Sequence, residues 1–135
     1  MSIPITFPYP RSANVELFDY YASLTIANGT STSIFSQQLP TLFKRGFITY
    51  AGFGIDNPTA FNGSIWQIRV NSVADRYYQS IQDQLGSFDD PKEIAPILVR
   101  PGDLISVYVT NTTGASHLYA GRLRGFFDFA YGEKS

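Results

Sequence analysis

The chain has 135 residues, of which 44% are hydrophobic and only 16% are charged, and its formal net charge is -1. This length predicts one domain with a core of its own. The absence of cysteine excludes disulfides, thiolate metal sites and cysteine nucleophiles. A net charge near zero argues against a nucleic-acid partner, which requires a basic surface. No apolar stretch is long enough to span a bilayer and no signal peptide is visible, so we expect synthesis in the cytoplasm and no membrane partner.

The first segment, residues 1–14, combines apolar side chains with three prolines at positions 4, 8 and 10. Proline lacks a backbone N–H and restricts its neighbours to extended conformations, which excludes a helix or a central strand. We predict an extended N-terminal arm that lies either along its own domain or on a neighbouring subunit. The side chains expected to make this docking contact are Ile3, Ile5, Phe7 and Tyr9.

Alternation of apolar and polar side chains predicts strands over residues 15–27 and 66–71. Strands are also predicted over residues 33–38 and over residues 47–55, which are apolar on both faces. Residues 28–31 contain Asn-Gly and predict a turn. Gly52 and Gly54 indicate a bulge or a close backbone approach. Trp66 alternates with Ile68 and Val70, which predicts a core position. In the first strand one face is expected to hold Phe18, Tyr20, Ala22, Leu24 and Ile26.

Residues 73–85 fit either a strand or a short helix, and we favour the strand, followed by a loop over residues 86–92. Further along, an apolar run at 97–99 meets Pro101-Gly102-Asp103, and the next residues alternate, with Ile105, Val107 and Val109 on one face. This pattern predicts a tight turn between two strands. A turn at 114–116 precedes a last strand over 118–131, in which Leu123, Phe127 and Phe129 align, and residues 132–135 form a frayed tail.

About eight strands with turns between them, and no long helix, predict an all-β fold. The expected architecture is an antiparallel β-sandwich of jelly-roll type, formed as a single domain over residues 15–131.

Candidate catalytic groups are few. His117 is the only histidine, no Gly-x-Ser-x-Gly elbow accompanies it, and a cupin-type metal site needs several histidines. We therefore interpret His117 as polar surface at a loop edge, although a Ser-His-Asp arrangement formed in space stays open. A small hydrolase would need His117 or an acid pair. We expect no catalytic residue, no metal ligand and no cofactor.

Two loops are candidate binding elements, residues 56–62 and 86–92. The first contains Asp56 and Asn57, and the second contains Asp89 and Asp90. The second loop, with Asp83 and Glu93 nearby, has oxygens that Ca²⁺ could use, but we favour a solvated turn in which the carboxylates cap backbone N–H groups. Candidates for a contact surface are Tyr21, Tyr77, Tyr78 and Tyr108. The basic pairs at 44–45 and 122–124 are interpreted as solvated strand ends.

The Pro-rich arm, the cysteine-free body and the turn from Val99 to Asp103 into Ile105–Val109 resemble small single jelly-roll virion proteins. That family includes decoration, penton and spike-base components of viruses and tailed phages. The resemblance implies a non-enzymatic structural protein of the virion. It would form a symmetric oligomer with copies of itself, a trimer or pentamer, on other capsid or tail proteins. The alternative is a carbohydrate- or receptor-binding jelly-roll module that uses loops at one end, with a surface glycan as its partner.

Overall fold

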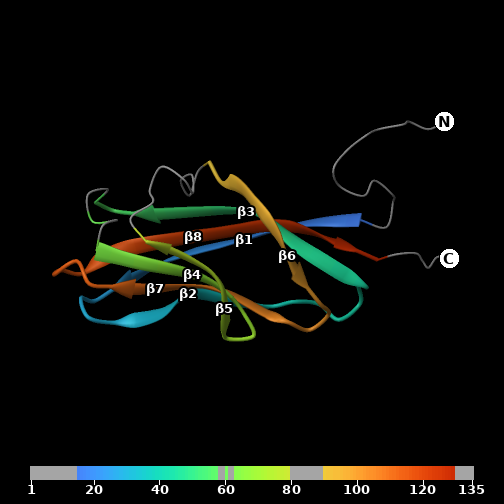
Figure 1. The fold of residues 1–135 in the computed structure, drawn as a ribbon, viewed down its shortest axis with the longest axis horizontal. Coiled ribbons are helices and arrows are strands. Elements are labelled where there is room, and N and C mark those ends of the chain that lie inside the picture. The colour runs from blue at the N-terminus through green and yellow to red at the C-terminus, as the bar shows by residue number, and fades with distance from the viewer. Residues whose placement is uncertain (1–14, 58–59, 61–62, 80–89, 130–135) are drawn as a thin grey trace.

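A computed structural model describes residues 15–57, 60, 63–79 and 90–129. The described chain consists of strands joined by short connections (Figure 1). The strands are β1 (Val15–Ile26), β2 (Ser31–Gln38), β3 (Arg45–Ile55), β4 (Ser64–Val70), β5 (Val73–Gln79), β6 (Lys92–Val99), β7 (Leu104–Asn111) and β8 (His117–Asp128). The predicted arm (residues 1–14) and tail (residues 132–135) lie outside the described residues.

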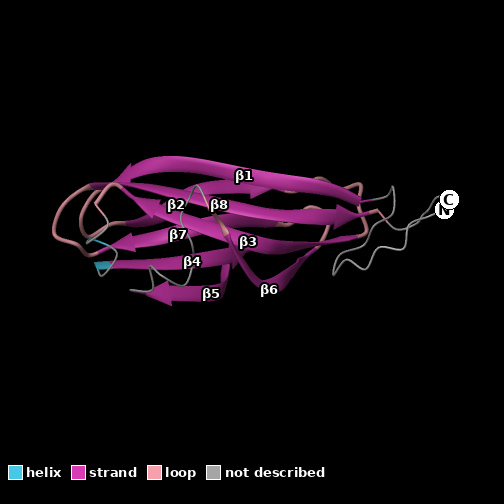
Figure 2. Cartoon of the chain, turned by 90° about the horizontal axis from the view of Figure 1, so that it is seen from above, coloured by secondary structure: helices cyan, strands magenta, loops and turns pink. Residues whose placement is uncertain are grey.

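The strands form two antiparallel sheets that pack face to face (Figures 1 and 2). We call the sheet with the order β1-β8-β3-β6 the β1 sheet, and the sheet with the order β2-β7-β4-β5 the β2 sheet. β4 and β5 follow one another within the same sheet. Every other pair of consecutive strands is divided between the two sheets, so the chain crosses from one sheet to the other at each of those connections. This crossing between two sheets is the arrangement of a jelly roll, so the predicted all-β antiparallel sandwich is confirmed.

The core lies between the two sheets and is built from the inner-facing side chains of the alternating strands. Trp66 of β4 stacks on Phe53 of β3 across the sandwich, with ring centroids 4.5 Å apart and an interplanar angle of 3°. Tyr119 of β8 meets the indole edge-on at 5.4 Å. Trp66 is 1% exposed, which confirms its predicted core position. The predicted inner row of β7, Ile105, Val107 and Val109, is fully buried as well.

A second aromatic cluster fills the opposite part of the core. The Phe127 ring lies 4.7 Å from the Phe18 ring and 4.5 Å from the Phe43 ring, both in stacked geometry. Gly125 makes room for this cluster, since a Cβ atom there would lie 1.9 Å from the Phe47 carbonyl oxygen and 2.6 Å from the Phe18 ring. The aromatic packing therefore requires glycine at this position.

The predicted Pro-Gly-Asp turn is present, and it connects the two sheets. Gly102 has a φ of 81°, and the Asp103 amide donates to the Arg100 carbonyl at 3.1 Å. Proline followed by glycine with positive φ is the signature of a type II turn. The strands on either side do not pair, because β6 bonds to β3 and β7 bonds to β2 and β4.

Several boundaries differ from the sequence-based prediction: β3 and β4 each begin two residues earlier than predicted, and β8 covers His117–Asp128 instead of residues 118–131. The strand β2 begins at Ser31, which pairs with Thr110, and so starts earlier than predicted. Asn71 and Ser72 have positive φ values of 54° and 68° and form the turn of the β4–β5 hairpin, although Asn71 was predicted to continue the strand. Positive φ at both central residues is the type I′ geometry that hairpin twist favours.

Another difference concerns the loop predicted over residues 86–92. Strand β6 already begins at Lys92, whereas residues 80–89 lie outside the described residues. β6 is an edge strand that contains Pro96, next to an irregularity in its pairing with β3. A proline in a strand is tolerated at such an edge because no ladder hydrogen bond is lost. The favoured strand over residues 73–85 is confirmed for residues 73–79.

Candidate functional site

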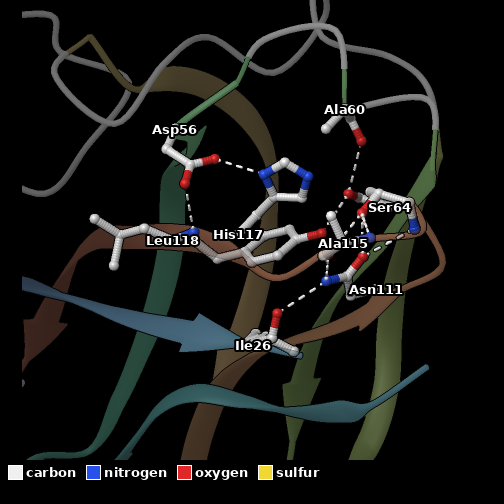
Figure 3. Close-up of polar contacts among 10 residues, drawn as sticks. Ile26, Asp56, Ala60, Ser64, Asn111, Ala115, His117 and Leu118 are labelled. Atoms are coloured by element: carbon white, nitrogen blue, oxygen red, sulfur yellow. Dashed lines mark hydrogen bonds and ion pairs between the residues drawn. The ribbon is translucent and has the colours of Figure 1, made fainter. Parts of the chain in front are cut away.

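A polar pocket lies at the end of the sandwich where β3 ends and β8 begins. Asp56 follows β3 directly, and His117 is the first residue of β8. The two side chains are joined by a bond of 2.7 Å between Nδ1 of His117 and Oδ1 of Asp56 (Figure 3). The second carboxylate oxygen of Asp56 accepts the Leu118 amide at 3.0 Å. The Asp56 amide in turn donates to the Leu118 carbonyl, so the acid is fixed to β8 at both backbone and side chain.

The Asp56 carboxylate determines which ring nitrogen of His117 carries the proton. The backbone amide of Leu118 and the ring of His117 lower the pKa of Asp56 below its usual value of 3.8, so the acid is ionised at neutral pH. An ionised carboxylate only accepts hydrogen bonds, which places the proton of neutral His117 on Nδ1. The other ring nitrogen, Nε2, then carries a lone pair. Figure 3 shows this nitrogen pointing away from Asp56.

The imidazole forms part of the wall of a pocket of about 520 Å³. Its described lining consists of small or polar residues, with no large apolar side chain. These residues are Asn57, Ala60, Gly63, Thr112, Thr113, Ala115 and His117. The side chain of His117 is only 13% exposed, so our interpretation of this residue as polar surface was wrong.

One buried amide holds the threonine side of the pocket in place. Asn111 ends β7, is fully buried, and uses its side chain in four hydrogen bonds. Its Nδ2 donates to the carbonyls of Ile26 and Ala115, both at 2.9 Å (Figure 3). Its Oδ1 accepts the backbone amide and the hydroxyl of Thr113. The loop after β7 is therefore fixed to the end of β1 as well as to itself.

The serine next to the pocket is not arranged as a nucleophile. The hydroxyl of Ser64 lies 2.8 Å from the Tyr119 hydroxyl and 3.0 Å from the Ala60 carbonyl oxygen, to which it donates. Ser64 is fully buried, and burial raises the pKa of Tyr119 above its usual value of 10.0. Both groups thus serve as neutral hydrogen-bonding partners beneath the pocket, and His117 pairs with Asp56 rather than with this serine.

The structure brings together some of the predicted loop residues and separates others. Asp56 is bonded to His117, and Asn57 lines the pocket together with His117. Asp90 is exposed immediately before β6 and is not part of the described pocket lining, and Asp89 and Asp83 lie outside the described residues. Within the described ranges, no three histidine or acidic side chains gather in a way that could hold a metal ion. The docking residues of the arm, Ile3, Ile5, Phe7 and Tyr9, lie outside the described residues too.

The outer face of the β1 sheet carries a row of apolar side chains across all its strands. Leu17 of β1 pairs with Phe126 of β8, Phe126 with Phe47 of β3, and Phe47 with Leu98 of β6. Leu17 is 79% exposed and Leu98 is 41% exposed. The two phenylalanine rings between them lie 5.5 Å apart.

Next to this row, acidic and basic groups neutralise one another. Arg122 of β8 makes two hydrogen bonds to Asp19 of β1, at 2.9 and 2.7 Å, and Arg124 lies 3.6 Å from the same carboxylate. Our interpretation of residues 122–124 as a solvated strand end was therefore wrong, because these arginines lie within β8 and pair with the neighbouring strand. In the other basic pair, Arg45 lies 3.9 Å from Asp128.

The candidate tyrosines differ in what their rings contact. The Arg69 guanidinium lies 3.5 Å above the Tyr108 ring and covers one of its faces. Tyr78 is partly buried and packs edge-on against Phe53. Tyr21 is 61% exposed on the outer face of the β1 sheet, with Arg122 at 5.4 Å from its ring. The side chain of Tyr77 lies outside what the structure describes.

No protein-family model matches this chain, and no curated protein is significantly similar to it. In the described part of the chain, no helix has the length and apolar character needed to cross a membrane.

Proposed function

We propose that this chain is a non-enzymatic structural protein of a virus or phage particle that assembles as a symmetric oligomer on or in the capsid. The observation that carries the proposal is the apolar row on the outer face of the β1 sheet. The jelly-roll strand order and the resemblance of the sequence to small virion proteins support the same function. Its partners are copies of itself, as a trimer or pentamer, together with other capsid or tail proteins.

The distribution of exposed apolar side chains favours one face as the assembly surface. Of the seven large hydrophobic side chains that are exposed in the described residues, four belong to the outer face of the β1 sheet. These four are Leu17, Tyr21, Leu98 and Leu118. Apolar residues gathered on one face are typical of surfaces that pack against other protein. Burial of this face would release about 25 cal/mol for each Å² of apolar area.

The charges on this face do not oppose its burial. Asp19 already pairs with Arg122 and Arg124 within one subunit, and Arg45 with Asp128. A paired group costs less to remove from water than an isolated one. The outer face of the β2 sheet differs, because its described side chains include Ser31, hydrogen-bonded to Thr110, and Arg69, stacked on Tyr108. Polar groups of this kind suit a surface that stays in water.

Sedimentation velocity of the full chain over a range of concentrations tests the proposal. We expect a defined oligomer for the natural sequence and a monomer for the double variant Leu17→Lys, Leu98→Lys, because the two charges would be buried without partners. The matched control is Leu42→Lys, Val73→Lys, which changes two side chains that are at least as exposed but lie outside this face. The control should assemble like the natural chain. A natural chain that stays monomeric at high concentration would contradict the proposal.

A further inference from the structure

The pocket beside His117 offers a second activity, which does not depend on assembly. We propose that it is a binding site for a neutral saccharide, anchored by a ligand hydroxyl that donates to Nε2 of His117. Three properties of the pocket support this assignment: its charge, the chemistry of its lining and the fixed state of the imidazole.

The charge of the pocket favours a neutral ligand. His117 is the only titratable group in the described lining, and its partner Asp56 lies directly behind it. With a neutral imidazole the pair keeps the negative charge of the Asp56 carboxylate, whose two oxygens are bonded to Nδ1 of His117 and to the Leu118 amide. The described lining itself supplies no carboxylate, lysine or arginine to pair with a charged ligand, and the Asp56 carboxylate behind the imidazole would repel a phosphate, whereas a hydroxyl needs only an acceptor.

The lining suits a hydroxyl-rich ligand better than an apolar one. Thr112 donates its hydroxyl to the Gly63 carbonyl at 2.9 Å, and Thr113 donates its own to Asn111 or Ala115. Because each hydroxyl has one proton and two lone pairs, both threonine oxygens can still accept from a ligand. Ala60, Gly63 and Ala115 keep the space open. A pocket of about 520 Å³ accommodates one or two sugar rings.

Asp56 acts as a positioning residue, since it keeps the proton on Nδ1 and so makes Nε2 an acceptor. This geometry gives the proposal a specific test. In Asp56→Asn the side-chain amide can donate to Nδ1, which moves the proton to Nε2 and turns the acceptor into a donor, with almost no change in shape. The variant should weaken binding about tenfold, as expected from the loss of one good hydrogen bond.

The experiment is an NMR titration of the full chain with methyl glycosides of glucose, galactose, mannose and N-acetylglucosamine. We expect at least one glycoside to shift the amide signals of Thr112, Thr113 and His117, with a dissociation constant on the order of millimolar, as few contacts are made. The nitrogen shifts of His117 should show the Nδ1–H tautomer in the natural chain and its loss in Asp56→Asn. Asp128→Asn, which alters a carboxylate outside the pocket lining, is the control and should leave binding unchanged.

Ala60→Leu provides a second variant that leaves the Asp56–His117 pair intact but fills the pocket, and it should abolish the shifts. The proposal is overturned if none of the four glycosides moves these signals. It is also overturned if a glycoside binds folded Ala60→Leu and the natural chain equally well. Because each glycoside is monovalent and the signals arise from the pocket itself, the result does not depend on whether the chain assembles.

Discussion

At the scale of single residues, Asn111 belongs to a recognisable sequence pattern and also holds the loop beside the pocket in place. The stretch Asn111-Thr112-Thr113 matches a glycosylation acceptor pattern, but the amide is fully buried in four hydrogen bonds. Its role is therefore to fix the loop after β7, and a glycan could not be attached to it in the folded chain. Turn chemistry is visible from the sequence. The bond to Ile26 is not, because the two residues are 85 positions apart.

We predict that Asn111→Ala lowers the free energy of unfolding by about 2–4 kcal/mol, because the buried carbonyl of Ile26, the Ala115 carbonyl and the Thr113 amide lose their partner together. Urea unfolding followed by tryptophan fluorescence measures this change. The control is Asn28→Ala, in which an exposed side chain loses a single bond from the Gly114 amide. The control substitution should lower the free energy of unfolding by less than about 1 kcal/mol. Equal costs for the two variants would contradict the assigned role of Asn111.

Gly125 gives a second prediction at the residue scale. Gly125→Ala should destabilise the fold by about 3 kcal/mol or more, because the added Cβ would overlap the Phe47 carbonyl and the Phe18 ring. Gly29→Asn is the comparison, since Gly29 has a φ of 80° and an added Cβ would meet nothing within 4 Å, and asparagine tolerates this conformation. Thermal unfolding should show a large loss of stability for the first variant and a small one for the second.

At the scale of elements, the pairing of β1 with β8 combines a full backbone ladder with an ionic contact. Hydrogen bonding to Arg122 lowers the pKa of Asp19 below its usual value of 3.8. The folded state therefore binds fewer protons than the unfolded chain at acidic pH. The resulting stabilisation is present above about pH 4 and is lost as the pH falls through the lowered pKa.

Asp19→Asn should therefore flatten the dependence of the unfolding free energy on pH below about pH 4, while the other carboxylates preserve part of it. Urea unfolding between about pH 2.5 and pH 7 measures the slope. Arg122→Gln removes the partner of Asp19 and should flatten the same part of the curve. A slope that is unchanged in both variants would show that this pair does not contribute to acid sensitivity.

The elements also show which features the sequence can predict. Alternation is a local property, so it correctly predicted the inner faces of β4 and β7. At residues 73–79 the sequence fitted a strand or a short helix, and the favoured strand is confirmed. Leu24 of β1 is a partial exception, since it belongs to the predicted inner row but is 39% exposed. The order of the strands depends on contacts between distant residues. The sequence therefore predicted that the turn at residues 100–103 joins two strands, but not that these strands belong to different sheets.

The pocket, too, depends on contacts between distant residues that the sequence does not reveal. Asp56 and Asn57 follow from a turn-like sequence, but the partnership of Asp56 with His117 spans 61 positions. His117 alone carries no signal in the sequence, because a single histidine beside a turn is usually exposed. Only the antiparallel placement of β3 beside β8 brings the acid to the imidazole.

At the scale of the whole molecule, the proposal of assembly includes the arm predicted over residues 1–14. Deletion of residues 1–10 should weaken oligomer formation or docking, because an extended apolar segment can add contacts to a neighbouring subunit. The fold should persist, since the buried core residues within the described part of the chain lie between Phe18 and Phe127. Sedimentation measures the first effect and circular dichroism the second. An unchanged oligomer after the deletion would show that the arm takes no part in assembly.

The central claim is that this chain acts by assembly through the outer face of its β1 sheet. The most direct test is electron microscopy of the native material that contains the chain, carried to a reconstruction in which each subunit is resolved. We predict a closed symmetric ring or a particle in which Leu17 and Leu98 are buried against another subunit. Separate monomers, or an assembly in which this face is open to solvent, would contradict the claim.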